Sequence, residues 1–573
     1  MPAKQPTAGL EIKVDGAKID AKWMDALLDV QVRDNLMLPD TALVRLRDPK
    51  GENIDSHPLK AAARLEILLS AAEEQTVKTV FDGEIVALEP EFLEGDCILA
   101  ARAYDKGHRL NRHRRSRTFQ NQTASDMVKT VAQAAGLALG TVESTGGAHE
   151  FFQQSMETDW DFCWRLAAMN DFEFLVEGTK FHFRKRKRSG VAATLKWGEG
   201  LLTFKPRMSA AGQVQDVTVT NHDPKTRQAI TGRATSPALA YSSPAAGQRN
   251  GLIGKLSGGS VVVADRVVTS TSEATDVAQS LLDRLSSSFI EADGTAFGDP
   301  AIAAGATVKL EGVGSFSGEY VLAQTTHLLT GGRGYTTAFS ISGRSARTIG
   351  DLVQRGNGTR NWGNALVIGV VTNNNDPEGM GRVRVKFEAL GSTMEGWWAR
   401  VATLNAGNER GVFMMPQPND EVVVGFEHGD PRRPFVLGSL YNGKAKLPGA
   451  LKDPQERKSL YGVKTDHEVL VDGKQQMTLR TGEKMTVEVN RNGQGGTGDY
   501  LLDAKGNIEE KAAQGVKVTA GQTIELTGNQ SVTIKGTGSV TVESSGQLDL
   551  KGASVNVQAT GPLTLKGAII NIG

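Results

Sequence analysis

The feature that most constrains this chain is a short repeat that fills its C-terminal end. Over residues 515–573 one phrase recurs, as VKVTAG, TIELTG, VTIKG, VTVESSG, LDLKG, VNVQATG, LTLKG and IINIG. In each phrase two apolar residues flank one polar residue, and joints that mostly contain glycine separate the phrases. This alternation is the periodicity of short strands.

The apolar pairs recur eight residues apart, with one seven-residue step before Val555. The same ladder begins earlier in the chain, near residue 461, and is interrupted over about 490–514. Met485 and Val487 also keep the step. The eighteen positions that we expect to form the core of the repeat are Val469, Val471, Met477, Leu479, Val516, Val518, Ile524, Leu526, Val532, Ile534, Val540, Val542, Leu548, Leu550, Val555, Val557, Leu563 and Leu565.

A fixed short period indicates stacked identical units, each of which buries its apolar face only against its neighbours. One chain of such narrow units could not enclose a useful core. Several identical chains wound about an axis could, because each would supply one wall. The repeat therefore predicts a multi-chain rod over 461–573, and a single-chain β-solenoid is the alternative.

The chain closes on an apolar end made of Ile569, Ile570 and Ile572 with Gly573. In a rod this segment would form a blunt tip. An exposed apolar end is usually the seat of a partner, so we expect a second protein to bind there.

Charge and cysteine content exclude several classes of protein. Lys+Arg and Asp+Glu both number 65, and this balance gives no general attraction to nucleic acid or anionic membranes. Cys97 and Cys163 are expected to be small buried residues rather than a disulfide or a metal site. The N-terminus lacks the apolar run of a signal peptide, and no segment approaches the roughly 18 apolar residues of a membrane helix. We therefore expect synthesis and folding in the cytoplasm.

The N-terminal part alternates between strand-rich and helical patterns. Strands expected within 10–104 suggest a first β-barrel over 1–115. Helices expected at 123–135 and 159–170, followed by a hairpin that turns at Glu177-Gly178, suggest an α/β insert over 116–190. A helix that starts at the capping box of Ser270 and Glu273, with strands at 307–310, 320–328 and 335–341, suggests a second barrel over 191–350. Residues 236–260 read as a loop and 351–364 as a linker.

The middle of the chain predicts an OB-type barrel over 365–442, followed by a linker over 443–460. Its five expected strands are ALVIGVVT, GRVRVKF, WWARV, GVFMM and EVVVGFE. Trp397 and Trp398, like the arginine-rich run at 109–117, raise the possibility of nucleic-acid binding. Acidic residues neutralise the surroundings of the tryptophans, and no recognition helix accompanies the arginines. We therefore predict no nucleic-acid partner.

Four long segments carry resemblances to two known families. TDWDFCWRLAAMNDFEFLVEGTKFHF and GDPAIAAGATVKLEGVGSFSGEYVLAQTTHLLTGGRGYTTAF resemble the phage late control protein D family of tail hubs. VTNNNDPEGMGRVRVKF, with the segment from EGWWARV to GSLYNG, resembles the OB domain of VgrG and phage spike proteins.

The resemblance implies a mainly β fold: a hub of two β-barrels with small α/β inserts, an OB-fold barrel, and a C-terminal intertwined trimeric β-helix or prism. It implies a homotrimer that forms the central spike of a contractile injection system. The hub would bind the inner tube protein and baseplate components. The C-terminal end would bind a PAAR-type tip protein, which carries its own metal, and the spike could carry an effector. Contraction would deliver the particle outside the cell or into a target.

The sequence gives no sign of catalysis. It contains no GxSxG, HExxH or Walker phrase, and the linker and the interruption are too short to fold an enzyme. His327, within an expected strand, is interpreted as a structural residue. We therefore predict a non-enzymatic spike without a cofactor or metal of its own. The alternatives are a hydrolytic enzyme, embedded in the hub or linked as cargo, and a trimeric fibre that binds cell-surface polysaccharide.

Overall fold

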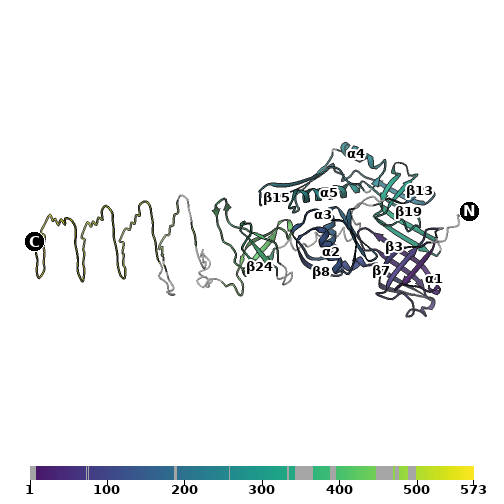
Figure 1. The fold of residues 1–573 in the computed structure, drawn as a ribbon, viewed down its shortest axis with the longest axis horizontal. Helices are drawn as coiled ribbons and strands as arrows, with labels where there is room; N and C mark the ends of the chain where they lie inside the picture. The colour runs from purple at the N-terminus through teal and green to yellow at the C-terminus, as the bar shows by residue number, and fades with distance from the viewer. Residues whose placement is uncertain are drawn as a thin grey trace. The chain divides into compact units, whose positions relative to one another are not determined.

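The structure is a computed structural model (Figure 1). It describes residues 8–72, 74, 76–185, 190–239, 241–256, 258–331, 334–341, 366–387, 395–446, 469–471, 476–487, 489 and 499–572. The predicted linker at 351–364, the start of the ladder at 461 and Gly573 lie outside these residues. The chain divides into two compact units, Met1–Lys464 and Thr465–Gly573, and each is described by itself.

The first unit is built on one sheet of eleven strands, in the order β14-β19-β23-β22-β3-β4-β7-β6-β5-β1-β2. The strands predicted for both hub units meet in this sheet, because β3 pairs antiparallel with β22 and sets Val32 opposite His327. The sequence did not indicate this junction. The strands are β1 (Leu10–Val14), β2 (Ala17–Lys18), β3 (Leu27–Asn35), β4 (Thr41–Arg47), β5 (Arg64–Leu69), β6 (Lys78–Leu93), β7 (Asp96–Asp105), β14 (Leu201–Met208), β19 (Ile290–Phe297), β22 (Gln324–Thr330) and β23 (Gly334–Ile341).

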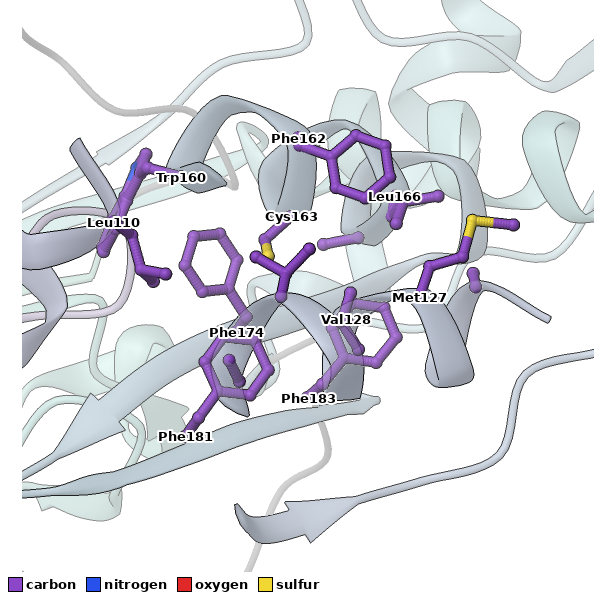
Figure 2. Close-up of a cluster of buried hydrophobic side chains, with 14 of the residues drawn as sticks. Leu110, Met127, Val128, Trp160, Phe162, Cys163, Leu166, Phe174, Phe181 and Phe183 are labelled. Carbon is purple, nitrogen blue, oxygen red and sulfur yellow. The ribbon is translucent and has the colours of Figure 1, made fainter. Parts of the chain in front are cut away.

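The α/β insert follows the prediction closely. Thr123 and Thr158 accept hydrogen bonds from backbone N–H groups at the starts of α2 (Ala124–Ala134) and α3 (Asp159–Asn170). Figure 2 shows Cys163 of α3 among the aromatic side chains that form the core of the insert. The strands of the insert are β8 (Arg114–Gln122), β9 (Ala138–Val142), β10 (His149–Thr158), β11 (Phe172–Glu177) and β12 (Lys180–Lys185).

The second part of the hub departs from the prediction in two places. The single strand expected at 320–328 is two strands, β21 (Gly318–Val321) and β22, because the chain changes sheets between them. The expected loop at 236–260 contains a helix, α4 (Arg249–Lys255). The guanidinium of Arg249 donates to Gln213 Oε1 and Val214 O, and these contacts, distant in sequence, hold the helix in place.

The remaining hub elements form two small sheets and two helices. One sheet runs β13 (Val191–Lys196), β20 (Thr307–Glu311), β21 and β17 (Tyr241–Ser242). The other runs β16 (Ala229–Ala234), β15 (Asp216–His222) and β18 (Ser260–Val263), and α5 (Thr271–Ser287) packs against it. A short helix, α1 (Ala21–Asp25), precedes β3. Single 3₁₀ turns lie at Pro49–Gly51, Lys106–Asn111, Ala246–Gln248, Gly314–Phe316 and Glu427–Gly429.

The middle of the chain is a closed five-stranded barrel in the order β24-β25-β26-β30-β29. Four strands match the prediction: β24 (Val367–Asn373), β25 (Arg382–Lys386), β26 (Ala399–Val401) and β29 (Glu421–Phe426). The expected strand GVFMM is wrong. The fifth barrel strand is β30 (Pro434–Leu440), and the chain near 411 forms only the two-residue pair of β27 (Ala406–Gly407) with β28 (Arg410–Gly411).

The second unit contains no helix or strand among the described residues of 469–572. Its chain, drawn in yellow in Figure 1, runs back and forth in repeated turns. A Cβ atom at Gly528 would lie 2.6 Å from Ser531 O, and one at Gly536 would lie 2.7 Å from Ser539 O. The same tight joint thus recurs at the eight-residue step, where a side chain would clash.

Candidate functional site

The eighteen ladder positions are exposed in the single chain. Their exposed fractions lie between 52% (Ile524) and 71% (Leu526), whereas Val422 and Val424, which alternate in the same way in the barrel, are fully buried. No backbone–backbone hydrogen bond joins residues within the described part of 469–572. One copy therefore leaves the apolar side chains of the ladder exposed, and the described backbone groups of 469–572 have no backbone partners.

The C-terminal end continues this exposure. Ile569, Ile570 and Ile572 are 80%, 51% and 88% exposed. These three residues are neighbours in sequence, and each is more than half exposed. The fourth residue expected at the tip seat, Gly573, is outside the described residues.

A second candidate site is the contact between the hub and the OB barrel, where Arg432 is buried. Its Nη1 donates to Glu273 Oε1 of α5 at 2.7 Å, and its Nη2 donates to Val267 O at 2.7 Å. Within the barrel it also donates to Asp430 Oδ2, at 2.9 Å. Its guanidinium carbon lies 5.3 Å from the ring centre of Phe152 in the insert. One side chain thus ties three parts of the first unit together.

The charges of this contact are matched. Burial acts to lower the pKa of Arg432, but the carboxylates of Asp430 and Glu273 outweigh it and raise that pKa. Burial acts to raise the pKa of Glu273, but the positive charge of Arg432 stabilises the carboxylate and lowers that pKa. Glu273 also accepts from Thr269 N at 2.8 Å, so it caps α5 and pairs across the contact.

Sequence reasoning identified only half of this arrangement. The capping box is confirmed, since Ser270 Oγ accepts from Glu273 N at 3.1 Å. Arg432, however, lies in the stretch HGDPRRP, which is dense in turn formers. A buried arginine in a loop has no periodicity that would reveal it, so its partner on α5 could not be found from the pattern.

A cavity of about 450 Å³ lies beside this contact. Its walls come from both sides: Phe151 of the hub insert stacks on Trp397 of the barrel, with ring centres 5.5 Å apart. Lys225 and Glu378 form an ion pair at 3.0 Å across the same contact. Trp397, one of the two tryptophans that raised the possibility of nucleic-acid binding, therefore helps join the hub to the barrel.

The strand β25 places a buried ion pair beside the barrel core. Val383 and Val385, with Phe387 just after the strand, belong to that core. Arg382, which alternates with them, is only 6% exposed, and its Nη2 donates to Asp376 Oδ1 at 2.7 Å. Although burial opposes it, this pairing, with hydrogen bonds from neighbouring backbone N–H groups, lowers the pKa of Asp376 to about 2.

The arginine-rich run is largely engaged within the hub. Arg109 pairs with Glu84, and Arg117 lies 3.3 Å from Asp159. Arg115 lies 3.6 Å from the same aspartate. Three of the five arginines thus bind carboxylates of the same chain.

Two buried titratable sites lie in the hub. His327 Nδ1 hydrogen-bonds with Tyr335 Oη at 2.7 Å and with Thr337 Oγ1 at 3.1 Å, and burial lowers its pKa to about 4. The structural role expected for this histidine is confirmed. The second site was not predicted: Asp105 accepts from Gly107 N at 2.7 Å and Asp40 N at 2.9 Å, and burial raises its pKa to about 7.

The cysteines match the prediction, because Cys97 and Cys163 are buried and unpaired with each other. Within the described ranges, no three His, Cys, Asp or Glu side chains converge in a way that could hold a metal ion. No helix in that same part of the chain is long and apolar enough to span a bilayer.

Two family models match this chain. The model described as the Alg8 N-terminal domain matches residues 4–331. The model described as the type VI secretion system/phage-baseplate injector OB domain matches residues 367–441, which hold the closed barrel.

The chain is also similar to curated spike proteins over a short stretch. Type VI secretion system spike protein VgrG4b of Pseudomonas aeruginosa is 40% identical over 81 residues, 13% of this chain and 10% of that protein. Spike protein VgrG3 of Vibrio cholerae is 36% identical over 80 residues, 13% of this chain and 8% of that protein. The chain spans about a tenth of the length of these curated relatives.

Among solved structures, an E. coli component of the type VI secretion system, c3393, is 14% identical with a TM-score of 0.48. That match covers 75% of this chain and 100% of the other. The Francisella PdpA–VgrG complex is 9% identical with a TM-score of 0.47, over 78% of this chain and 80% of the other.

Proposed function

We propose that this chain, which belongs to the Alg8 N-terminal domain family through residues 4–331, is the structural spike and hub of a contractile, phage-tail-like injection system. The injector OB match at 367–441 and the likeness to type VI secretion spike proteins support this function. The order of parts supports it as well: a β-rich hub, an OB barrel, and then a repetitive ladder.

The observation that carries the proposal is the exposure of the ladder in one copy. Eighteen apolar side chains at a fixed step are more than half exposed. Burying such a stripe requires other chains with the same stripe, which favours a homotrimer in which each chain supplies one wall. In this arrangement the eighteen positions form the core of a rod, and the rod gives the spike its rigidity.

The proposed partners would bind at the hub and at the apolar end of the ladder. The hub would bind the inner tube protein and the baseplate. It would consist of two proposed barrels at 1–115 and 191–350 and an insert at 116–190. The OB domain at 365–442 would act as a collar between linkers at 351–364 and 443–460, ahead of the rod at 461–573. Ile569, Ile570 and Ile572 would seat a PAAR-type tip protein, and an effector could travel as cargo.

The proposed role is mechanical and not enzymatic. The chain would be made in the cytoplasm, assembled into the particle and driven outward or into a target on contraction. An enzyme hidden in the hub or a polysaccharide-binding fibre is not favoured, because the match to an injector OB domain points to a spike.

The native mass of the purified chain in solution tests the proposal. Light scattering should give three times 61.2 kDa. A folded species of one copy, with its ladder protected from proteolysis, would instead show a self-contained solenoid and would refute the spike assignment.

A further inference from the structure

The OB barrel carries an apolar projection that no described part of its own chain covers. Residues 403–414, here called the arm, form a narrow hairpin closed by the pairs Ala406–Gly411 and Gly407–Arg410. Leu404, Phe413 and Met414 on the arm are 95%, 80% and 62% exposed. These exposures are as large as those of the ladder, although the arm belongs to a folded domain.

The arm is held at its base and is not a loose loop. Ala402 N donates to Val436 O at 2.8 Å, and Val412 N donates to Asn405 O at 3.0 Å. Just after the arm, the side chain of Met415 packs against the barrel core. A firmly based hairpin with exposed large apolar side chains is a surface that a partner covers.

The same barrel has an apolar patch on its outer face. Leu366, Ile368 of β24 and Leu437 of β30 are 66%, 47% and 51% exposed, and we call them the outer patch. Leu366 and Leu437 meet over Gly425 of β29, where a Cβ would lie 3.6 Å and 3.7 Å from their Cδ atoms. The patch is therefore continuous across three neighbouring strands.

The arm and the outer patch leave one another uncovered within one copy, since the apolar side chains of both are exposed. The patch is centred on β29, and its neighbours are β24 and β30. The arm follows β26, where Ala402 bonds to Val436 of β30, and Phe413 lies beside Gly381, just before β25. Because β25 is one of the two strands that β29 does not touch in the closed order, Phe413 lies over a different part of the barrel from the centre of the patch.

We propose that the arm of one copy packs on the outer patch of the next copy, so that three OB barrels form a closed ring. The inference rests on the proposed trimer. A contact between two different faces of identical chains is heterologous, and such contacts close into rings. One arm–patch contact for each copy would cover both apolar surfaces. The ladder, joined to each barrel after β30, would hold the three copies close enough for these contacts to form.

Photocrosslinking of the full chain tests this contact. Phe413 is replaced with p-benzoylphenylalanine, and isotopically heavy and light copies are unfolded, mixed equally and refolded together. Crosslinks should join the arm to peptides that contain residues 366–368 or 435–440, and about half should link a heavy copy to a light one. Crosslinks confined to one copy, or directed to other regions or to the other arms, would overturn the proposal.

A double-mutant cycle provides the second test. Phe413→Asp and Leu437→Asp should each lower the thermal midpoint of the assembled chain, and the double variant should lose little more than the worse single variant. Ser439→Asp, on the exposed part of the same strand, should have little effect. Fully additive losses would overturn the arm–patch contact.

The two proposals fail in distinguishable ways. A native mass of three copies together with crosslinks elsewhere would refute the arm–patch contact and leave the spike function intact. A native mass of one copy would refute both.

Discussion

Arg432 of the OB barrel and Glu273 of α5 are joined by a hydrogen-bonded ion pair of 2.7 Å, and both side chains are largely buried. The pair lies between domains that are far apart in sequence. It therefore fixes the barrel on the hub through chemistry that neither domain could supply alone.

Replacing Arg432 with Met should destabilise the first unit by about 3–5 kcal/mol, because Glu273 and Asp430 would remain buried without a counter-charge. Urea unfolding of the full chain, followed by tryptophan fluorescence, would measure the loss. Arg433→Met is the matched control, since it removes the same charge at the next position, where that charge is only the smallest of the effects that lower the pKa of Asp223. Equal stability of the two variants would contradict the assigned role.

Charge in the ladder should prevent assembly. Ile534→Asp would place three carboxylates at one level of the proposed rod axis, and their desolvation should shift the native mass from three copies toward one. Thr533→Asp, one position away on the polar side, should leave the mass unchanged. An intact Ile534→Asp trimer with an unchanged thermal midpoint would show that Ile534 is not in a shared core.

Removal of the chain end should separate tip binding from trimerisation. A chain that stops after Leu565 loses Ile569, Ile570 and Ile572 but keeps all eighteen ladder positions. We expect it to retain a native mass of three copies and to lose capture of a PAAR-type tip protein in a pull-down. Asn571→Ser in the full chain serves as the control. Tip capture by the shortened chain would refute the seat.

His327 should make the hub sensitive to acid. Its pKa is lowered to about 4 in the fold from an ordinary value of 6.5, so its stabilising effect is complete above about pH 6.5 and is lost as the pH falls toward 4. The loss should reach about 2–4 kcal/mol. His327→Asn should therefore gain stability relative to wild type as the pH falls through this window, as measured by urea unfolding. The exposed His222→Asn should run parallel to wild type, and a parallel His327→Asn curve would contradict the prediction.

Asp105 should act in an overlapping window with the opposite sign. Its pKa is raised to about 7 by burial, so its contribution is greatest below about pH 4 and is lost as the pH rises toward 7. Asp105→Asn should gain stability relative to wild type as the pH rises, by at most about 1.4 kcal/mol per pH unit. Exposed Asp55→Asn is the control. If the stability of Asp105→Asn relative to wild type falls as the pH rises, Asp105 is instead held as a carboxylate.

The sequence predicted the elements whose signals are local. The bounds of α3 follow from a helical pattern, and the hairpin of β11 and β12 follows from the turn at Glu177-Gly178. Cys163 in α3 is buried as expected. The ladder pairs were found because eight-residue spacing can be read directly from the letters.

Features that depend on distant contacts could not be predicted. The β3–β22 junction, α4 and the partnership of Arg432 with Glu273 each join segments separated by dozens to hundreds of residues. The strand expected at GVFMM shows the same limit. Its apolar residues have strand-like composition, but β30 takes the place beside β26, and Phe413 and Met414 are left in solvent. Apolar content alone cannot tell a barrel strand from a projecting arm.

The exposure of the ladder has a consequence for the order in which this molecule is built. The ribosome makes the ladder after the segments that form the hub and barrel. A nascent copy can therefore fold those domains while its ladder still lacks partner chains. A copy whose hub is misfolded would keep its ladder exposed and open to proteolysis. Correctly folded copies that associate would bury their ladders and protect them. Exposure of the repeat would then mark incomplete assemblies for degradation, and only complete assemblies would persist.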